Sequence, residues 1–209
     1  MFILPSRSRP HNIARLVIAW RATNATSPLV LRLDLNDPRL PEYLEIKMPP
    51  HWFVRIGSPN FVGPLTNEVF KEWPNSDWYG ILGDDVVPLT YEWDRKLSEA
   101  CGSNAIAYGN DTIHGRNLCT HPVIGGELVR EMGFITLPGL KGLYGDTVWM
   151  HIGQTRDCLK YLDNVILEHR HWSNGKAPMD ASYASHTRYA EDQGVYERWR
   201  SQWQPKAIF

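Results

Sequence analysis

Cysteine is scarce in this chain, because its 209 residues contain only Cys101, Cys119 and Cys158, and no two of them form a CxxC pair. An odd number of widely spaced cysteines does not build a disulfide framework or a thiolate zinc site. The sequence therefore fits a reducing compartment, and we expect the protein to be cytoplasmic.

Long apolar runs and a large net charge are also missing. The first ten residues, MFILPSRSRP, lack the apolar core of a signal peptide, and no run approaches the roughly 18 residues of a membrane span. The 22 basic and 23 acidic side chains nearly cancel, which argues against general affinity for nucleic acids. With 43% apolar residues the chain can bury one substantial core, so we expect a single domain over residues 1–209.

The sequence does contain an alternation of strand-like and helix-like patterns. Pro10 opens a helix in which four apolar residues share one face: Ile13, Leu16, Val17 and Trp20. Apolar strand candidates lie at residues 2–4, 29–33, 52–56 and 78–82. This order predicts βαβ units and an α/β fold with a mainly parallel central sheet flanked by helices. Ligands of such sheets lie beyond the carboxyl ends of the strands.

The clearest chemical feature is the segment WYGILGDDVVP, in which an apolar strand leads into Asp84 and Asp85. Two adjacent carboxylates repel each other unless something compensates their charge. Hard oxygen ligands suit Mg²⁺ or Mn²⁺, and the same ion can hold a diphosphate. The alternative is a turn or helix cap made by Asp84, and the segment alone is compatible with both.

A second cluster follows a strand candidate at residues 165–167. In an extended segment, alternation places His169 and His171 on one face, next to Glu168 and Arg170. Such a pair suits a metal or an anionic phosphate, and a metal held by one aspartate and one histidine is chemically coherent. The alternative is an incidental pair of surface histidines.

The segment LYGDTVW holds a third candidate, Asp146, at the start of a predicted helix over residues 145–154. Its carboxylate fits a helix cap, and it equally fits a general base that takes the proton from an attacking hydroxyl. The residues alone leave both interpretations open.

Taken in order, the motifs resemble those of the GT-A glycosyltransferases, in particular the large inverting second family and its small, phage-encoded, single-domain relatives. The resemblance rests on six segments spread over most of the chain: PSRSRP, LRLD, YGILGDDVVP, HPVIGGELVREMG, LYGDTVW and ILEHRHW. It implies a GT-A, Rossmann-like domain with a nucleotide-binding half over residues 1–100. An acceptor and catalytic half would cover 101–180, and a helical tail 181–209.

The resemblance also implies roles for residues at the donor nucleotide. Pro5, Ser6 and Arg7 correspond to the first loop, beside the base. Asp34 corresponds to the acidic residue that contacts the base, and Asp84 to the one near the ribose.

Further roles concern the metal and the reaction. Asp85 corresponds to the metal ligand that bridges to the donor diphosphate, and His169 to a late histidine that joins the metal shell, with His171 as the competing choice. Asp146 corresponds to the catalytic base, although the family's usual acidic pair is here Gly145 followed by Asp146.

The implied reaction is direct displacement at the anomeric carbon of a nucleotide sugar, with a UDP-sugar favoured and a GDP-sugar as the alternative. It would use Mn²⁺ or Mg²⁺, with help from Arg7 or Arg170 on the leaving diphosphate. Gly125 and Gly126 would let backbone approach the donor sugar and the acceptor. The acceptor is open: a modified DNA base, a glycan or a protein. A phage origin would place the protein in the host cytoplasm.

Two other functions stay open. A nucleotidyltransferase also uses paired aspartates on an α/β domain, but it normally has a Gly-rich basic phosphate loop, and PSRSRP contains no glycine. A non-catalytic module that recognises carbohydrate or nucleic acid would stack its ligand on aromatic side chains. The nine tryptophans are compatible with that function, and so is the basic, aromatic stretch over residues 196–206, with Arg198, Trp199, Arg200, Trp203 and Lys206.

Overall fold

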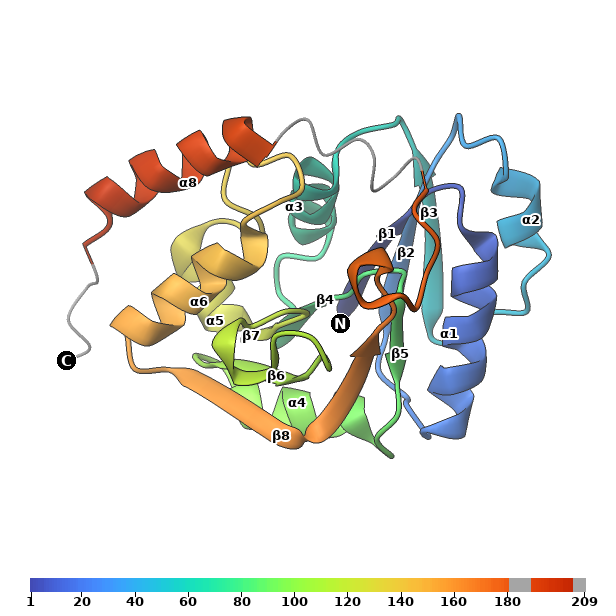
Figure 1. The fold of residues 1–209 in the computed structure, drawn as a ribbon, viewed down its shortest axis with the longest axis horizontal. Helices are drawn as coiled ribbons and strands as arrows, with labels where there is room; N and C mark the ends of the chain where they lie inside the picture. Colours follow the sequence, from blue (N-terminus) through green and yellow to red (C-terminus); the bar gives the residue numbers. More distant parts are fainter. Residues whose placement is uncertain (181–188, 205–209) are drawn as a thin grey trace.

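The computed structural model describes residues 1–180 and 189–204 (Figure 1). Its strands are β1 Phe2–Ser6, β2 Leu29–Asp34, β3 Trp52–Gly57, β4 Trp78–Ile81, β5 Val86–Pro88, β6 Ile106–Asn110, β7 Val123–Gly125 and β8 Leu159–His169. Its helices are α1 Pro10–Ala22, α2 Leu40–Leu44, α3 Val62–Glu72, α4 Trp93–Cys101, α5 Gly126–Met132, α6 Gly145–Thr155 and α8 Tyr189–Gln202. Two 3-10 turns, η1 Gly115–Asn117 and η2 Trp172–Asn174, complete the described elements.

The strands form one sheet of eight in the order β3-β2-β1-β4-β7-β6-β8-β5. β1 is parallel to β2 and β4, β2 to β3, and β6 to β8. β7 is antiparallel to both β4 and β6, and β5 is antiparallel to β8. The sheet is therefore mixed, and the prediction of a mainly parallel sheet is wrong. The regular alternation ends after β4, and β5 and β7 are too short, at three residues each, to stand out in an apolar pattern.

Helices cover both faces of the sheet, as predicted. α1 and α4 pack on one face, where Trp20 and Trp93 are fully buried. α3, α5 and α6 pack on the other, where Trp149 is fully buried. Each such aromatic side chain contributes about 1.5–3 kcal/mol through burial. These tryptophans therefore belong to the core and not to a ligand surface.

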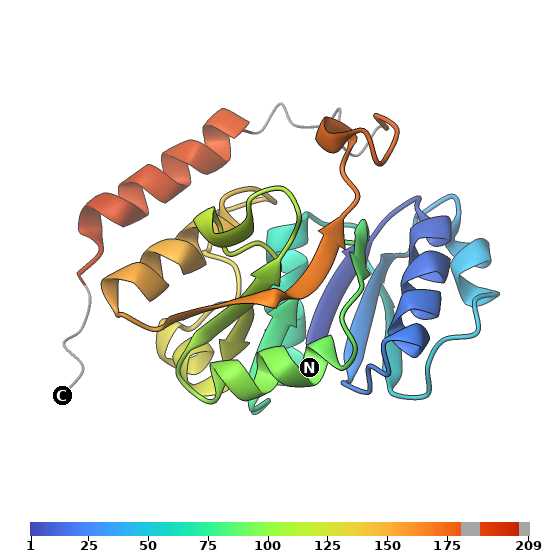
Figure 2. The same cartoon turned by 60° about the horizontal axis from the view of Figure 1, so that its bottom comes forward.

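Helix α8 lies across α6, on the outside of the domain (Figure 2). The ring of Trp199 meets His151 edge-on, and Trp203 Nε1 donates a hydrogen bond to Thr155 Oγ1 at 3.0 Å. The aromatic residues of this helix are thus used largely for packing on α6. Of the helical tail predicted over residues 181–209, the structure describes α8 and two residues beyond it, and 181–188 and 205–209 lie outside the described residues. No helix in the described ranges is long and apolar enough to cross a membrane.

Candidate functional site

A cleft of about 760 Å³ opens at the carboxyl ends of β1, β2 and β4. Its walls are the loops that follow these strands, the loop before α3, the segment 141–143 and the side of α8. Six residues that the sequence singled out line this cleft: Pro5, Ser6, Arg7, Asp34, Asp84 and Asp85. The three parallel strands end at the same edge of the sheet, so residues far apart in the chain meet there.

Asp34 ends β2 and is buried, with two arginines beside it. Arg7 Nη1 donates to Asp34 Oδ2 at 2.7 Å, and Arg32 Nη1 lies 3.7 Å from Oδ1. The Oδ1 atom is buried without a hydrogen-bond partner among the described residues. The Arg7 side chain is 43% exposed, so it can move toward a ligand and free the carboxylate.

Asp84 is held from both sides by protein groups. Ser6 Oγ donates to Asp84 Oδ2 at 2.7 Å, and Arg9 Nη1 donates to Oδ1 at 3.0 Å. The Tyr43 hydroxyl lies 2.8 Å from Ser6 Oγ and accepts a hydrogen bond from Arg9 N. Because the Ser6 proton points to Asp84, the Tyr43 hydroxyl is the donor to Ser6. Burial raises the pKa of Asp84 to about 6, against the opposing pull of Arg9.

Arg9 links this network to the segment that follows β8. Its Nε and Nη2 both donate to the carboxylate of Asp180 at 2.7 Å. Neither Arg9 nor Asp180 was predicted as a site residue from the sequence. The signal for Arg9 was the second arginine of PSRSRP, whereas the contact with Asp180 spans 171 positions and has no local signature.

Asp85 meets the end of β8 through the pairing of β5 with β8. Val86 is the register partner of His169, and Arg170 N donates to the Asp85 carbonyl at 2.8 Å. This register brings His169 Nε2 to 3.4 Å from Asp85 Oδ2. Two atoms that each bind the same cation at about 2.0–2.2 Å lie at a distance from each other close to this 3.4 Å. Asp85 and His169 therefore have the spacing of two ligands of one metal.

Two further residues lie next to His169 and were not predicted from the sequence. Asp111, just after β6, is 1% exposed, and its Oδ2 lies 3.9 Å from His169 Nδ1. The ring of His121 lies 4.9 Å from the His169 ring, and its Nδ1 accepts a hydrogen bond from Gly83 N. Burial lowers the pKa of His121 to about 3, so this ring is neutral. Burial also lowers the pKa of His169, but Asp111 and Asp85 outweigh it and raise that pKa to about 9.

The residues present fit a hard divalent cation held by few protein ligands. Asp85 and His169 supply one oxygen and one nitrogen, and Asp85 also lines the cleft in which phosphate oxygens would complete the shell. His169 Nδ1, Asp111 Oδ2 and His121 Nε2 are buried without hydrogen-bond partners among the described residues, which is typical of a site that a ligand completes. No cluster of three or more metal-binding side chains occurs in the described ranges.

His171, the competing ligand, is turned differently. Its Nδ1 lies 2.7 Å from Ser173 Oγ, and its ring packs against Trp172. The ring centroids of His169 and His171 are 5.3 Å apart. The contact with Asp85 described above therefore favours His169 as the ligand, and the assignment stays a prediction.

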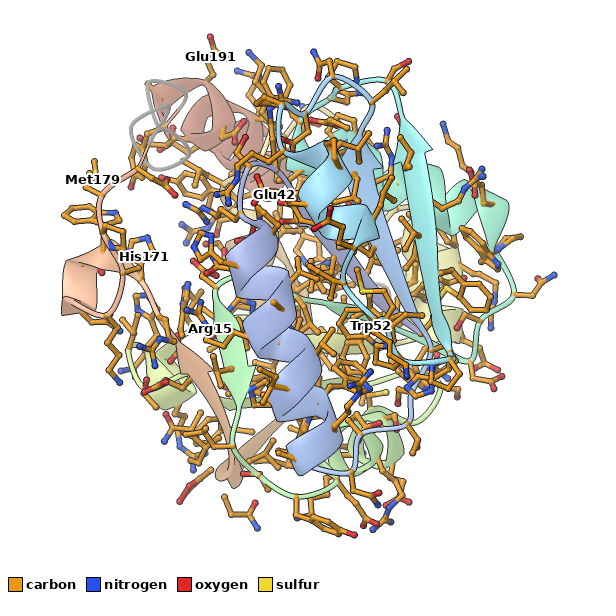
Figure 3. The ribbon with its side chains drawn as sticks, turned by 90° about the vertical axis from the view of Figure 1, so that its right-hand side faces the viewer. Arg15, Glu42, Trp52, His171, Met179 and Glu191 are labelled. Atoms are coloured by element: carbon orange, nitrogen blue, oxygen red, sulfur yellow. The ribbon has the colours of Figure 1, made fainter. Side chains whose placement is uncertain are left out.

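Positive charge gathers beside the two aspartates. In Figure 3, Arg15 projects from α1 toward the side of the molecule on which His171 lies. Burial lowers the pKa of Arg15, and the nearby Arg170 lowers it further. The Nε atoms of both arginines are buried without hydrogen-bond partners in the part of the chain that the structure describes. This pair adds cationic groups to the site where a diphosphate is predicted.

Asp146 lies in the first turn of α6, three residues after Leu143, which lines the cleft. Its Oδ1 accepts a hydrogen bond from Thr147 N at 2.7 Å, so its carboxylate is turned to its own helix. Burial raises the pKa of Asp146, which moves it toward that of a base working near neutral pH. Its role as base stays a prediction.

Gly125 and Gly126 do not reach the cleft. Gly125 pairs with Trp78, at the start of β4, whereas Asp84 and Asp85 follow the end of that strand. A Cβ atom on Gly125 would lie 2.2 Å from the Ser103 backbone, and one on Gly126 would lie 2.1 Å from Ser76 O. Close backbone packing at the opposite edge of the sheet therefore explains both glycines.

No protein-family profile matches this chain, and no curated protein matches it in sequence. Solved structures do match its fold. One is the "putative nucleotide-diphospho-sugar transferase" of Desulfovibrio desulfuricans, with a TM-score of 0.54, 12% identity, and coverage of 95% of this chain and 96% of that one. Another is a Mycobacterium tuberculosis protein in complex with manganese, with a TM-score of 0.56, 10% identity, and coverage of 84% and 94%.

A third similar structure is the "putative glucose-1-phosphate thymidylyltransferase" of Bacillus anthracis, in complex with a sucrose. Its TM-score is 0.53 at 7% identity, and the match covers 88% of this chain and 98% of that one. At such low identities these likenesses establish a shared α/β fold along most of the chain, and the function must be argued from the site.

Proposed function

We propose that this protein is a metal-dependent glycosyltransferase that binds a nucleotide sugar in the cleft and transfers the sugar to an acceptor hydroxyl. The observation that carries the proposal is the meeting of Asp85 and His169, 3.4 Å apart, at the edge of a cleft lined by Arg7 and Asp34. The fold shared with the Desulfovibrio protein supports a nucleotide-sugar substrate.

The donor nucleotide would lie along the strand ends. Asp34 Oδ1 is buried and has no hydrogen-bond partner within residues 1–180 and 189–204, so it is an acceptor for a base N–H, and the Arg7 side chain can turn to the ligand. Asp84 is the weaker candidate for the ribose, because Ser6 and Arg9 already occupy its two oxygens. We therefore assign Asp84 chiefly to holding the first loop against β4.

The leaving diphosphate would lie at Asp85 and His169, with Arg15 and Arg170 close by. When bound there, Mn²⁺ or Mg²⁺ supplies positive charge that stabilises the diphosphate as it leaves. The manganese complex of a protein with this fold supports the choice of metal.

Asp146 is our candidate for the base that accepts the proton of the acceptor hydroxyl. Replacement of Asp146 by asparagine keeps the side-chain shape and the Thr147 contact but removes the basic oxygen. We expect turnover to fall about 10²- to 10⁴-fold with donor affinity little changed. Asp157→Asn, on an exposed turn after α6, is the matched control. Full activity of Asp146→Asn in an acceptor assay would show that another group is the base.

Donor hydrolysis tests the proposed function without knowledge of the acceptor. The protein is incubated with Mn²⁺ and a panel of UDP- and GDP-sugars, and released nucleoside diphosphate is measured. We expect slow release from one member of the panel, lost on omission of the metal and in Asp85→Ala. Equal release by the wild-type protein and Asp85→Ala would contradict the proposal.

Nucleotidyl transfer is the second candidate, because the Bacillus anthracis structure shares this fold. It predicts a different product, since a nucleoside triphosphate and a sugar 1-phosphate would give pyrophosphate. Pyrophosphate release with those substrates, together with inert nucleotide sugars, would favour this function over glycosyl transfer.

A further inference from the structure

Three strand ends meet at the candidate metal site. In the sheet, β8 lies between β6 and β5, parallel to the first and antiparallel to the second. The residue after β6, the last residue of β8 and the residue before β5 are therefore neighbours. They are Asp111, His169 and Asp85.

The backbones of β6 and β8 lie close together at Gly109. The pairing of these strands shifts register between Gly109 and Asn110, and a Cβ atom on Gly109 would lie 2.4 Å from Val165 O. A side chain there would push β8 away. Past this point His169 N donates to the Asp111 carbonyl at 3.0 Å, which fixes the two residues side by side.

The two oxygens of the Asp111 carboxylate have different surroundings. Its Oδ1 accepts hydrogen bonds from the backbone N–H groups of Ile113, His114 and Gly115, at 3.0, 2.7 and 2.9 Å. Those bonds hold the carboxylate in place. Burial raises the pKa of Asp111, but the interaction with His169 and the three backbone hydrogen bonds outweigh it and keep that pKa well below its usual range. Its Oδ2 has no hydrogen-bond partner in the part of the chain that the structure describes, and it faces His169 Nδ1 at 3.9 Å.

His169 Nδ1 is likewise buried without a hydrogen-bond partner among the described residues. Thus an unpartnered acceptor faces an unpartnered ring nitrogen, in a region where buried polar groups normally pair. The opposite ring nitrogen, Nε2, is the one that meets Asp85. A ring with its proton on Nδ1 would satisfy Asp111 and leave the Nε2 lone pair for a cation.

We propose that Asp111 is a positioning residue, which holds the His169 ring with its proton on Nδ1 so that Nε2 can bind the cation shared with Asp85. This inference rests on the proposed function, because it concerns the same metal site. It assigns to Asp111 a role that was not predicted from the sequence, and it explains why a buried carboxylate follows β6.

Replacement of Asp111 by asparagine is the direct test. The amide oxygen can still accept the three backbone hydrogen bonds, but the amide nitrogen then faces His169 Nδ1 and favours the proton on Nε2. We expect the affinity for Mn²⁺, measured by electron paramagnetic resonance without nucleotide, to fall about 10- to 100-fold. Asp163→Asn, an exposed change six positions before His169 on β8, should bind Mn²⁺ like the wild type.

A spectroscopic measurement on the wild-type protein separates positioning from a purely structural role. With saturating Mg²⁺ and ¹⁵N-labelled histidine, the His169 spectrum should show a protonated Nδ1. This measurement needs no variant and therefore holds even if Asp111→Asn fails to fold, which its thermal unfolding reveals. A proton on Nε2, or wild-type Mn²⁺ affinity in folded Asp111→Asn, would overturn the role of Asp111 but leave the proposed metal site standing. Absence of Mn²⁺ binding by the wild-type protein would overturn the metal site as well.

Discussion

Asp84 and Asp85 are neighbours in the chain, but their different surroundings indicate different roles. Both oxygens of Asp84 are bound by Ser6 and Arg9, within a network that continues to Tyr43. Asp85 instead approaches His169 and lines the cleft. The adjacent charge of Asp85 also raises the pKa of Asp84, after the larger effect of burial. The first aspartate is therefore an anchor for the fold, and the second lies beside His169 at the cleft, where a cation is predicted.

This division predicts opposite outcomes for two isosteric variants. Asp84→Asn leaves the buried Arg9 without one of its charged acceptors, so the unfolding free energy without metal should fall by about 1–3 kcal/mol. Asp85→Asn removes a repulsive charge and should cost less. Stabilisation by Mn²⁺ should persist in Asp84→Asn and vanish in Asp85→Asn. Urea denaturation with and without Mn²⁺ measures both effects, and equal losses in the two variants would refute the division.

Tyr43 gives the network a pH dependence that does not involve the metal site. Burial raises the pKa of its hydroxyl to about 12 from an ordinary value near 10. Above pH 10 the unfolded chain loses this proton while the folded protein keeps it. The stabilising contribution is therefore complete below pH 10 and is lost by about 1 kcal/mol per pH unit up to pH 12.

Tyr43→Phe isolates this contribution. The difference in unfolding free energy between the wild-type protein and the variant should be constant up to pH 9 and should shrink by about 1 kcal/mol at pH 11. Other tyrosines titrate in both proteins and cancel in the difference. Tyr91→Phe, at an exposed position outside the network, provides the comparison. A difference that does not change with pH would mean that Tyr43 ionises as it does in the unfolded chain.

At the scale of elements, α8 shapes the cleft through one buried carboxylate. Asp192 is 1% exposed and accepts hydrogen bonds from the backbone N–H groups of Lys141, Gly142 and Leu143, at 2.9, 3.0 and 2.8 Å. These three residues line the cleft just before α6. Helix α8 is therefore part of the site, although it lies at the outside of the domain in Figures 1 and 2.

Asp192→Asn should loosen this contact. The amide cannot accept all three hydrogen bonds, and each buried N–H left unpaired costs about 1–3 kcal/mol. We expect faster amide hydrogen exchange in residues 139–144 and 189–202, with the exchange of β1 and β2 unchanged. Glu191→Gln is the control, because its ion pair with Lys141 is exposed and contributes about 0–1 kcal/mol. Similar exchange in both variants would show that α8 is held by its aromatic contacts instead.

At the scale of the whole molecule, the sequence predicts the half of the sheet formed by β1 to β4, where strands and helices alternate along the chain. β1 to β3 alternate with helices, and the predicted ranges of all three, and of β4, lie within about two residues of the observed strands. The polar residues at the ends of those strands, such as Arg7, Asp34 and Asp85, can therefore be placed at one edge of the sheet from the sequence alone. The other half depends on long-range register, which has no local pattern.

The role of Asp111 could not be predicted from the sequence. This residue follows an apolar segment at residues 105–108, and that was the available signal, but nothing local says that β6 lies beside β8. β5 and β7 have only three residues each, so their antiparallel pairing could not be predicted from the sequence either. The pairing of β5 with β8 nevertheless determines that Asp85 meets His169. The residues at the strand ends could therefore be predicted from the sequence. The groups that surround the candidate cation site could not.

The proposed function also predicts how the whole domain responds to its ligands. If the diphosphate binds through a cation at Asp85 and His169, nucleotide and metal must stabilise the fold together. At a nucleotide concentration about 100 times Kd, linkage gives about 2.7 kcal/mol, and a chain of this size gains roughly 2–4 °C in Tm per kcal/mol.

We therefore expect UDP or GDP with Mn²⁺ to raise Tm by several degrees, and neither component alone to match that shift. Asp85→Ala should lose the joint effect while keeping its own fold, because the anchor at Asp84 is intact. A shift with nucleotide that does not depend on Mn²⁺ would contradict a metal-bridged diphosphate. Stabilisation by an oligonucleotide or a glycan without nucleotide would instead favour a binding module, whose ligand would not need the cation between Asp85 and His169.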